Sequence, residues 1–217
     1  MSAAQLLVVL DVDSTLTRDE GIDLLAESVS PKVAAEVAAI TAAAMRGEID
    51  FAQSLTQRVR ALAGVSRATI EQATARVRIT DGAHTLVTTL HAHGHLVGAV
   101  SGGFHEMVDP LALELGLDMH RANRFEWEGD ALTGGILGPL IDAAAKERTL
   151  LEWAQAHHID LARTVAIGDG GNDVAMLRRA GVGIAFMAKP VAKDAADVII
   201  DTPDLSRVLD TLGIERL

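Results

Sequence analysis

The chain of 217 residues contains no cysteine. This absence excludes disulfide bonds, thiolate metal sites and cysteine nucleophiles, and it agrees with a reducing compartment. The chain also lacks an apolar run near the roughly 18 residues that a membrane helix requires. Residues 6–10 are apolar, but this run is too short for a signal peptide, follows no basic residues and meets aspartates at once. We therefore expect a cytoplasmic protein that is neither secreted nor membrane-spanning.

Basic residues are scarce relative to acidic ones. The 19 lysines and arginines face 30 aspartates and glutamates, which gives a formal net charge of -11. Such a surface repels nucleic acids and anionic membranes, so we expect neither as a partner. A small anionic substrate can bind only where cations gather locally, through a metal ion or a few placed lysines and arginines. Both a monomer and a homodimer are compatible with this composition.

Short apolar runs predict buried strands, because none of them shows the polar alternation of a half-exposed strand. These runs occupy residues 6–10, 96–100, 164–167, 182–186 and 198–200. Helical patterns, several of which end at a glycine, follow at residues 83–93, 104–115, 143–157, 173–179 and 205–212. Alternating strands and helices predict an α/β fold with a doubly wound parallel sheet.

Two segments depart from this alternation. Residues 18–78 carry only helix signals, including capping residues and an alanine-rich run, and so predict an all-helical insertion after the first strand. We therefore assign residues 1–17 and 79–217 to a core domain and residues 18–78 to a helical domain. Residues 120–137 alternate around a glycine–aspartate pair, which predicts a hairpin beside the sheet.

Two aspartates follow the first apolar run directly. Asp11 and Asp13 stand at the carboxyl end of a predicted strand, which is where open parallel sheets bind ligands. Being two residues apart in an extended or just bending segment, they can face one cavity, and Ser14 and Thr15 offer hydroxyl and main-chain N–H groups to an anion. A surface turn or a cap for the next helix is the structural alternative.

Glycine-rich segments follow two more predicted strands. Residues 101–104 read "SGGF", and their glycines either admit a ligand close to the backbone or serve only the turn into a helix. Residues 168–173 read "GDGGND" and lack the third glycine of a dinucleotide fingerprint, which excludes a nicotinamide site of that type. Asp169 and Asp173 instead suggest a hard cation such as Mg²⁺, although turn formation alone would also explain them.

Lys146 lies near the start of the predicted helix 143–157, where an isolated lysine is usually solvated. Its position becomes informative when it is considered together with Asp11, Asp13 and the two glycine-rich segments. Together they would bring carboxylates, glycines, a hydroxyl and a cation to one edge of the sheet, as an active site requires. The alternating histidines His91, His93 and His95 could suggest zinc, but they straddle a predicted helix end, where histidine interacts well with the helix dipole, so we assign them no metal.

Four segments of the chain, in order and spacing, resemble the four motifs of haloacid dehalogenase-type phosphatases. They are "DVDSTLT", "SGGF", Lys146 and "GDGGND". The resemblance is closest to the phosphoserine phosphatases of this family, through "DSTLTRDEGID", "FAQSLTQRVRAL", "ANRFEWEGDALTGGILGP" and "GIAFMAKP". It covers nearly the whole chain, and it departs mildly at Gly171, where alanine is common.

The resemblance implies Mg²⁺-dependent hydrolysis of O-phospho-L-serine to L-serine and phosphate, the last step of serine biosynthesis, through an aspartyl-phosphate. It assigns Asp11 as the nucleophile and Asp13 as the general acid and base. Lys146 and Mg²⁺ would cancel the repulsion between the ionised nucleophile and a phosphate dianion. The family pattern places the metal on the Asp11 carboxylate, the Asp13 main-chain carbonyl and Asp169, with Asp173 ligating or orienting.

The resemblance also implies which residues hold the substrate. Ser101 and the Gly102 N–H would grip the phosphate, with Asn172 beside it. The insertion, residues 18–78, resembles the family's cap, which reads the amino acid part of the substrate. In that cap Glu20 would meet the ammonium group, and Arg58 would hold the carboxylate by a two-pronged hydrogen bond that lysine could not reproduce. The apolar side of the closed pocket would be lined by Phe51 and Met45.

Two other functions stay open. A related phosphatase or phosphotransferase, for instance one that transfers phosphate from phosphoserine to homoserine, would use the same aspartyl-phosphate, because motifs define chemistry better than substrate. Glu20 and Arg58, which would bind the ammonium and carboxylate groups of phosphoserine, distinguish a phosphoserine phosphatase from this alternative. A signalling receiver also phosphorylates an aspartate beside Mg²⁺, a hydroxyl and a lysine, but it needs neither Asp13 nor a helical insertion.

Overall fold

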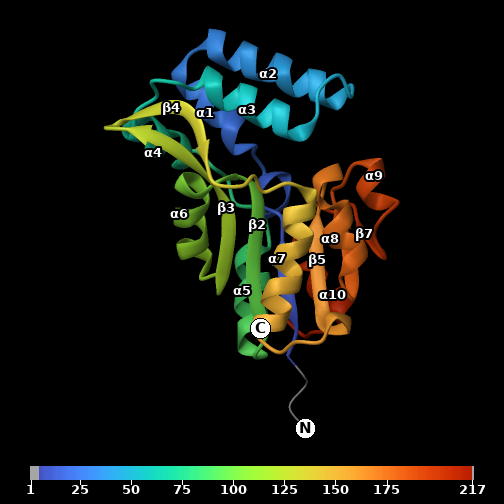
Figure 1. Cartoon of the computed structure of the whole chain (residues 1–217). Coiled ribbons are helices and arrows are strands. Elements are labelled where there is room, and N and C mark those ends of the chain that lie inside the picture. Colours follow the sequence, from blue (N-terminus) through green and yellow to red (C-terminus); the bar gives the residue numbers. More distant parts are fainter. Residues whose placement is uncertain (1–4, 217) are drawn as a thin grey trace.

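The computed structural model describes residues 5–216. Within this range one seven-stranded sheet forms, in the order β4-β3-β2-β1-β5-β6-β7, with helices on both faces (Figure 1). The strands are β1 Leu7–Leu10, β2 Leu96–Phe104, β3 Met119–Glu128, β4 Ala131–Leu137, β5 Thr164–Gly168, β6 Val182–Phe186 and β7 Val198–Ile200. All neighbouring pairs are parallel except β3 and β4, which are antiparallel. The predicted doubly wound parallel sheet is confirmed, with an antiparallel strand at one edge.

Strand β1 lies at the centre of the sheet, between β2 and β5. Val8 and Leu10 pack into the core on one face, whereas Leu7 and Val9 pack into the core on the other. All four side chains are fully buried. The run is continuously apolar because a strand covered on both faces has no position that meets water. Truncating Leu10 to alanine would therefore cost about 2–5 kcal/mol of stability.

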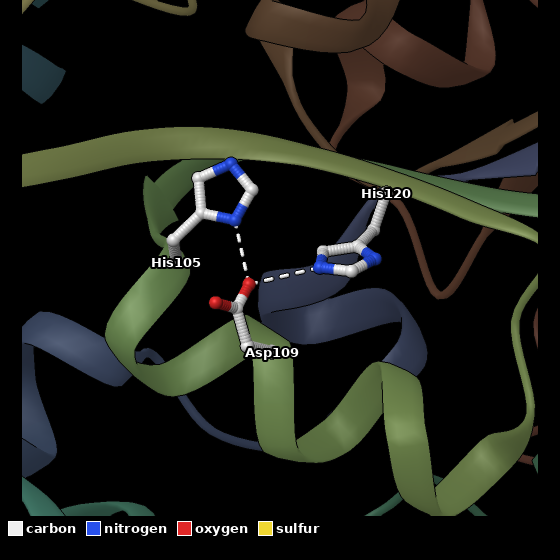
Figure 2. Close-up of side chains that lie close together, drawn as sticks. All are labelled: His105, Asp109 and His120. Carbon is white, nitrogen blue, oxygen red and sulfur yellow. Dashed lines mark hydrogen bonds and ion pairs between the residues drawn. The ribbon is translucent and has the colours of Figure 1, made fainter.

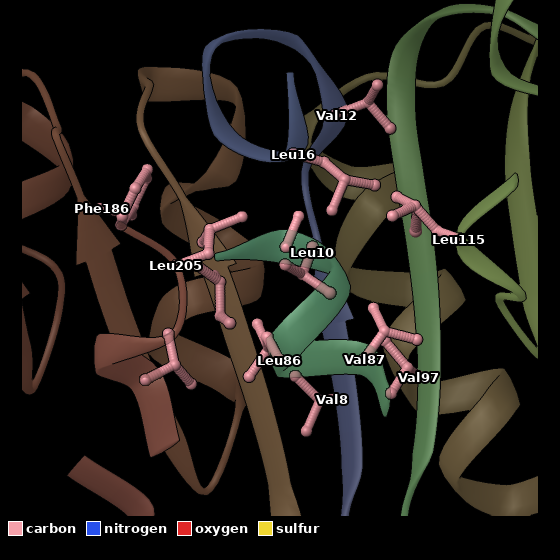
Figure 3. Packing of buried hydrophobic residues seen from close by; sticks show 14 of the residues in the cluster. Val8, Leu10, Val12, Leu16, Leu86, Val87, Val97, Leu115, Phe186 and Leu205 are labelled. Carbon is pink, nitrogen blue, oxygen red and sulfur yellow. The ribbon is translucent and has the colours of Figure 1, made fainter. Parts of the chain in front are cut away.

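Helices cover the two faces of the sheet in separate sets. One face packs against α5 Ala83–Ala92, α6 His105–Leu115 and α10 Arg207–Leu212, as the close-up of this core shows (Figure 3). The other face packs against α7 Ala143–Ala156, α8 Val174–Arg179 and α9 Pro190–Lys193. None of the helices in the described range is long and apolar enough to cross a membrane.

The structure corrects the predicted course of "SGGF". Strand β2 extends through this segment to Phe104, and α6 begins only at His105, so the glycines do not open a helix. The reason is tertiary, because β3 continues alongside and pairs Phe104 with Asn123 beyond an irregularity in the ladder. The predicted hairpin around Gly129 and Asp130 is confirmed, but its place beside the sheet is corrected. Strand β3 pairs in parallel with β2 and so belongs to the sheet, while β4 returns beside it.

The insertion after β1 contains only helical elements between residues 21 and 74 of the described chain, as predicted. They are α1 Gly21–Val29, α2 Pro31–Met45, α3 Phe51–Ala61 and α4 Arg67–Thr74. Three of their starts carry side-chain caps, from Ser30, Asp50 and Ser66. In Figure 1 these helices lie beyond the carboxyl ends of β1 and β2.

A second apolar core joins the inserted helices to the outer part of the β3–β4 hairpin. Leu55 and Val59 of α3 belong to it together with Phe125 and Leu132 of the hairpin. The rings of Phe125 and Phe104 stack with their centroids 3.7 Å apart. The hairpin therefore links the helical part to the sheet. The assignment of residues 18–78 to a separate domain stays a proposal, and the ends of the assigned core, residues 1–4 and 217, lie outside the described residues.

Candidate active site

The chain turns sharply where β1 ends. The Asp11 N–H still donates to the Ile167 carbonyl of β5 at 2.8 Å, so pairing in the sheet holds this residue in place. A single helical turn, Val12–Leu16, follows, in which Asp13 is extended and Ser14 is left-handed at φ 57°. This kink brings the Asp11 and Asp13 side chains to one cavity. The predicted pairing of the two carboxylates is therefore a consequence of the turn.

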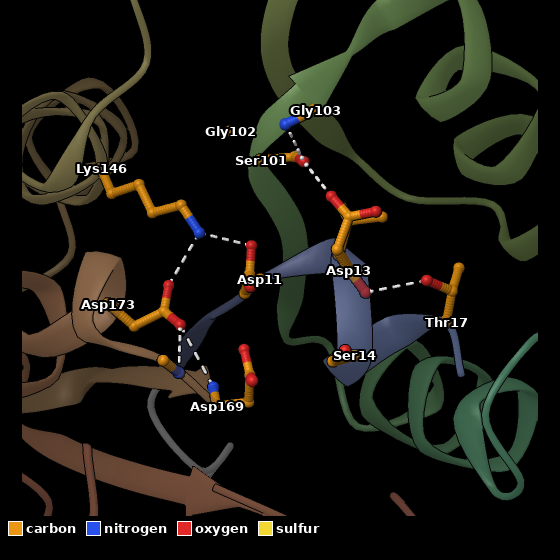
Figure 4. Close-up of polar contacts among 12 residues, drawn as sticks. Asp11, Asp13, Ser14, Thr17, Ser101, Gly102, Gly103, Lys146, Asp169 and Asp173 are labelled. Atoms are coloured by element: carbon orange, nitrogen blue, oxygen red, sulfur yellow. Dashed lines mark hydrogen bonds and ion pairs between the residues drawn. The ribbon is translucent and has the colours of Figure 1, made fainter. Parts of the chain in front are cut away.

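Lys146 is fully buried and lies between two aspartates (Figure 4). Its ammonium group donates to Asp11 Oδ1 and, at 2.7 Å, to Asp173 Oδ1. Burial alone would lower the pKa of Lys146, but the two adjacent carboxylates outweigh burial and raise it. The lysine is thus a fixed positive charge beside Asp11. It reaches this place from the first turn of α7, where Asp142 caps the helix by accepting from the Ala145 N–H at 2.8 Å.

The loop after β5 is wound around Asp173. Its Oδ2 atom accepts from the N–H groups of Asp169, at 3.1 Å, and Gly170, at 3.0 Å, while its Oδ1 atom faces Lys146. A Cβ atom on Gly168 would collide with the Asp173 carboxyl group, so only glycine fits there. Both Asp173 oxygens therefore have protein partners, which favours the orienting role over direct metal ligation.

One carboxylate oxygen from each of Asp11, Asp169 and Asp173 lies within 4.8 Å of the others, which is a spacing that a cation can bridge. Burial and the negative charge of Asp173 raise the pKa of Asp11, against the effect of Lys146. Burial also raises the pKa of Asp169, although Lys189 opposes it. These acids lack sufficient positive charge from the protein alone, and oxygen donors of this kind suit Mg²⁺. The donor set fits a magnesium ion.

Asp13 stands apart from this cluster. Its Oδ1 atom accepts from the Gly21 N–H at 2.8 Å, and its Oδ2 atom accepts from the Ser101 hydroxyl at 3.2 Å. Burial, followed by the charge of Glu20, raises the pKa of Asp13 to about 6. A carboxyl group with such a pKa can both give and take a proton near neutral pH, as an acid and base catalyst must.

A cavity opens between these residues and the inserted helices. It is lined by Asp11, Asp13, Glu20, Ile22, Phe51, Leu55, Arg58, Gly102, Gly103, Asp169, Asn172 and Lys189. Most of the predicted site residues thus share one cavity. Ser101, Lys146 and Asp173 are buried behind the wall and contact it through hydrogen bonds to Asp13, Asp11 and the Asp169 main chain.

The model of the haloacid dehalogenase-like hydrolases matches residues 8–178 of the chain. The chain belongs to this family. It is 50% identical to a phosphoserine phosphatase of Streptomyces coelicolor over 98% of its own length and 52% of that protein. It is 46% identical to a phosphoserine phosphatase of Streptococcus thermophilus over 98% of both chains. The chain thus spans about half of the first relative and nearly all of the second.

A solved structure described as a phospho-aspartyl intermediate analogue of phosphoserine phosphatase superposes with a TM-score of 0.90. It is 39% identical in sequence, and the match covers 96% of this chain and 99% of that one. The predicted membership of the haloacid dehalogenase family and the predicted fold class are therefore confirmed. The activity class, a hydrolase, is confirmed with them.

On the helical side of the hydrolase cavity, Arg58 and Glu20 both reach the wall as predicted. The Arg58 Nε atom is buried without a hydrogen-bond partner among the described residues. Burial lowers the pKa of Arg58, although Asp23 and Glu20 oppose this effect. Glu20 accepts a hydrogen bond from the Ser14 hydroxyl at 2.7 Å, which joins it to the turn Val12–Leu16.

Met45 is the predicted site residue that the structure does not bring to the cavity. It ends α2 with 74% of its surface exposed, whereas Phe51, at the start of α3, lies in the wall. Helix α2 is alanine-rich and buries only Val37 within the described structure, so its pattern gave no sign of which end faces the cavity.

Sequence reasoning missed Lys189 as a site residue. Its ammonium group lies 3.2 Å from Asp169 Oδ2, at the edge of the cavity. The signal was present in "GIAFMAKP", residues 183–190, whose first half lies in β6 and whose second half, with Lys189, follows that strand at the same edge of the sheet. Ile22, Leu55 and Gly103 also line the cavity. Nothing in the local sequence marks Ile22 and Leu55, since apolar residues of a helix are usually core, whereas Gly103 lies in the "SGGF" segment that the sequence had indicated.

The three alternating histidines each have a separate partner. His91 Nε2 lies 2.9 Å from Asp118 Oδ2, and His93 Nδ1 lies 2.9 Å from the Thr89 carbonyl. His95 Nδ1 accepts from the main-chain N–H of the residue before β1, at 3.2 Å. These contacts tie the end of α5 to its surroundings.

Proposed function

We propose that this chain is a Mg²⁺-dependent phosphoserine phosphatase, which hydrolyses O-phospho-L-serine to L-serine and phosphate as the last step of serine biosynthesis. One observation carries the proposal. The same cavity holds a carboxylate fixed beside a buried lysine, Asp11 with Lys146, and a half-buried arginine, Arg58, whose buried Nε atom lacks a hydrogen-bond partner in the described chain. A phosphorylated amino acid would place its phosphate beside Asp11 and Lys146 and its carboxylate beside Arg58. The similarity to phosphoserine phosphatases along the chain supports this reading.

The reaction would proceed in two displacements. The Asp11 carboxylate attacks phosphorus and forms an aspartyl-phosphate, while the bond from phosphorus to the serine oxygen breaks and Asp13 protonates that oxygen. Water then attacks phosphorus, Asp13 takes its proton, and Asp11 is released as a carboxylate with inorganic phosphate. Lys146 would compensate negative charge throughout, because it lies beside the Asp11 carboxylate in a buried site.

Magnesium would be held by Asp11, Asp169 and the Asp13 main-chain carbonyl, and Asp173 would orient its neighbours. When bound, the ion supplies the positive charge that lets an anionic nucleophile approach an anionic phosphate. The raised pKa values of Asp11 and Asp169 support this assignment, because both acids lie in a buried cluster that is short of cations. Ser101, the Gly102 N–H and Asn172 would bind the phosphate oxygens.

Residues 18–78 would act as the cap that recognises the amino acid part. Arg58 would bind the substrate carboxylate and Glu20 its ammonium group, while Phe51 would contact the short carbon chain. Closure of the cap would exclude bulk water from the phosphoryl transfer. We also propose a cytoplasmic location, which rests on the cysteine-free composition and on a substrate typical of central metabolism.

The experiment is a phosphate-release screen over phosphoserine, phosphothreonine, sugar phosphates and p-nitrophenyl phosphate. We expect phosphoserine to give the highest kcat/KM, EDTA to abolish release and added Mg²⁺ to restore it. A preference for sugar phosphates would contradict the assigned substrate. Release that is insensitive to EDTA would contradict the assigned metal. Appearance of O-phosphohomoserine when homoserine is added would identify a phosphotransferase instead.

A further inference from the structure

The ladder between β2 and β3 is interrupted beside the cavity. Val100 pairs with Arg121, and the next pair along the strands joins Phe104 to Asn123. Three residues of β2, 101–103, therefore lie opposite a single residue of β3. The longer path pushes this segment, hereafter the phosphate loop, out of the regular ladder, and two of its members line the cavity. Regular β pairing cannot hold the phosphate loop, so other groups must do so.

One replacement comes from the start of α6. His105 Nε2 accepts a hydrogen bond from the Ala122 N–H at 3.1 Å, where a strand partner would otherwise stand. On the other side of the ring, His105 Nδ1 lies 2.6 Å from Asp109 Oδ1, and His120 Nε2 lies 2.8 Å from the same oxygen (Figure 2). This cluster fastens the start of α6 to β3.

The same three side chains have the composition of a metal site, but the hydrogen bond from Ala122 argues against one. Because Nε2 of His105 accepts a hydrogen bond from the Ala122 N–H, the ring proton of the neutral imidazole must reside on Nδ1. A metal ion at that position would need the Nδ1 lone pair. We therefore interpret His105, Asp109 and His120 as a hydrogen-bonded clamp.

The second replacement is Asn123, which is only 2% exposed. Its Nδ2 group donates to the Gly102 carbonyl at 2.8 Å, and its Oδ1 atom accepts from the Ile141 N–H at 2.9 Å. Only one orientation of the amide satisfies both bonds, since a flipped amide would place two donors and two acceptors face to face. Ile141 immediately precedes Asp142, the cap of the helix that carries Lys146.

The hydrogen bonds continue from Asn123 to Asp13 in the turn Val12–Leu16. The peptide whose carbonyl Asn123 holds also bears the Gly103 N–H, which donates to the Ser101 hydroxyl at 2.7 Å. That hydroxyl donates in turn to Asp13 Oδ2 at 3.2 Å. A Cβ atom on Gly103 would lie only 3.0 Å from both of these oxygens, so the packing leaves the peptide little freedom. One buried amide thus ties the start of α7, the phosphate loop and Asp13 into a single network.

We propose that Asn123 is a positioning residue for phosphoryl transfer, a role that rests on the proposed function. It sets the plane of the Gly102–Gly103 peptide, and through that peptide it aims the Ser101 hydroxyl. It touches no reacting atom. Its effect should therefore fall on the step that all phosphate esters share, and the recognition of the amino acid part should be unaffected.

The test is Asn123→Asp, which keeps the shape of the side chain and an acceptor for Ile141. Its second oxygen would face the Gly102 carbonyl, so the bond to the phosphate loop becomes a repulsion. We expect kcat to fall by about 10- to 100-fold for phosphoserine and for p-nitrophenyl phosphate alike, with KM for phosphoserine changed by less than about threefold. A folded variant with kcat within about twofold of the native value would overturn the proposal.

The matched control is Thr164→Val, which removes a buried hydroxyl that bonds Leu161 and Gly181 at the start of β5. It should lose similar stability but keep kcat. If Asn123→Asp fails to fold, Asn123→Ser replaces it, and amide hydrogen exchange at Gly103 gives an independent readout. We expect that exchange to speed up about tenfold or more in Asn123→Ser, because the peptide loses its anchor, and to stay unchanged in Thr164→Val. Unchanged exchange at Gly103 in Asn123→Ser would overturn the proposal.

The two substrates separate this proposal from the proposed function. If the native chain hydrolyses p-nitrophenyl phosphate but not phosphoserine, the assigned substrate is wrong, and the effect of Asn123→Asp can still be measured. If the native chain hydrolyses both and the variant loses only phosphoserine, the substrate stands and Asn123 acts in recognition, which contradicts a role in positioning the phosphate loop.

Discussion

The two sides of the cavity differ in how completely their charged groups are hydrogen-bonded. On the sheet side, Lys146 and Asp173 are fully buried, and the lysine ammonium and both aspartate oxygens have hydrogen-bond partners. On the helical side, Arg58 Nε in the cavity wall and Asp23 Oδ1, which lies outside that wall, are buried without partners in the described part of the chain; the neutral Thr15 hydroxyl of the turn after β1 is also without one. A buried polar group without a partner costs about 1–3 kcal/mol. The charged groups on the sheet side are therefore preorganised, whereas those on the helical side lack hydrogen-bond partners that a substrate would supply.

The charges show the same difference. On the sheet side burial raises the pKa of Asp11, Asp13 and Asp169, and even Lys146 does not offset this for Asp11. On the helical side burial lowers the pKa of Arg58. The first wall thus lacks positive charge, which a metal ion would bring, and the second lacks an anion, which a substrate carboxylate would bring. Chemistry and recognition are therefore separable, and mutations on the two walls should have different signatures.

The largest effect should come from Asp11→Asn on the sheet side. The amide oxygen can still accept from Lys146, so the fold should persist, but the nucleophile is lost. We expect kcat to fall by roughly 10³-fold or more for every phosphate ester. Phosphate release from phosphoserine and p-nitrophenyl phosphate measures this. Asp201→Asn, which alters an exposed acid outside the cavity, serves as the control. Persistent turnover of either substrate by Asp11→Asn would contradict the nucleophile assignment.

The next largest effect should be on stability, from Lys146→Met. The change leaves Asp11 and Asp173 buried side by side without their cation, which should cost about 3–5 kcal/mol of the free energy of unfolding near pH 8. The loss should shrink toward pH 5. Burial raises the pKa of Asp11 in the folded state, and removing Lys146 raises it further, so the folded chain then binds a proton that the unfolded chain does not.

Urea unfolding of Lys146→Met at pH 5 and pH 8 measures this effect. The control is Lys193→Met, which removes a lysine paired with Asp201 at the surface and should cost less than about 1 kcal/mol. Equal losses from the two variants, or a loss from Lys146→Met that grows toward pH 5, would show that the ion pairs of Lys146 with Asp11 and Asp173 do not stabilise the fold.

On the helical side, Arg58→Ala should act on recognition. We expect KM for phosphoserine to rise by about 10- to 100-fold, because a charged hydrogen bond to the substrate carboxylate is worth about 1.5–3 kcal/mol. Hydrolysis of p-nitrophenyl phosphate should change little, since that ester carries no carboxylate. Arg58→Lys should recover only part of the loss, because an ammonium group cannot form the paired bond. Equal loss with both substrates would show that the two walls are not separable.

The sheet side was far more predictable from the sequence than the helical side. Asp11, Asp169 and Asp173 follow buried strands, and parallel strands end at one edge, so a local pattern fixed their common location. The prediction for Met45 rested on resemblance alone, and its position depends on how α2 packs. The course of β2 through "SGGF" was also not predictable, because its extension depends on pairing with β3, which is distant in the sequence.

The smallest effect should come from Asp23→Asn. It tests whether a partly buried carboxylate near Arg58 destabilises the fold when no substrate is bound. Burial raises the pKa of Asp23, and Arg58 only partly opposes this. A carboxyl group whose folded pKa is raised stabilises the fold below its unfolded pKa, near 4, and this contribution is lost as pH rises through the folded value. The variant should therefore gain stability relative to the native chain between about pH 4 and pH 7, by less than about 1 kcal/mol because the group is partly exposed.

Urea unfolding at several pH values measures this gain in stability. The control is Glu27→Gln on the same helix, since Glu27 is paired with Arg76 at 2.8 Å. A gain that appears only in Glu27→Gln would place the unmet charge outside the cavity and remove the contrast between its walls.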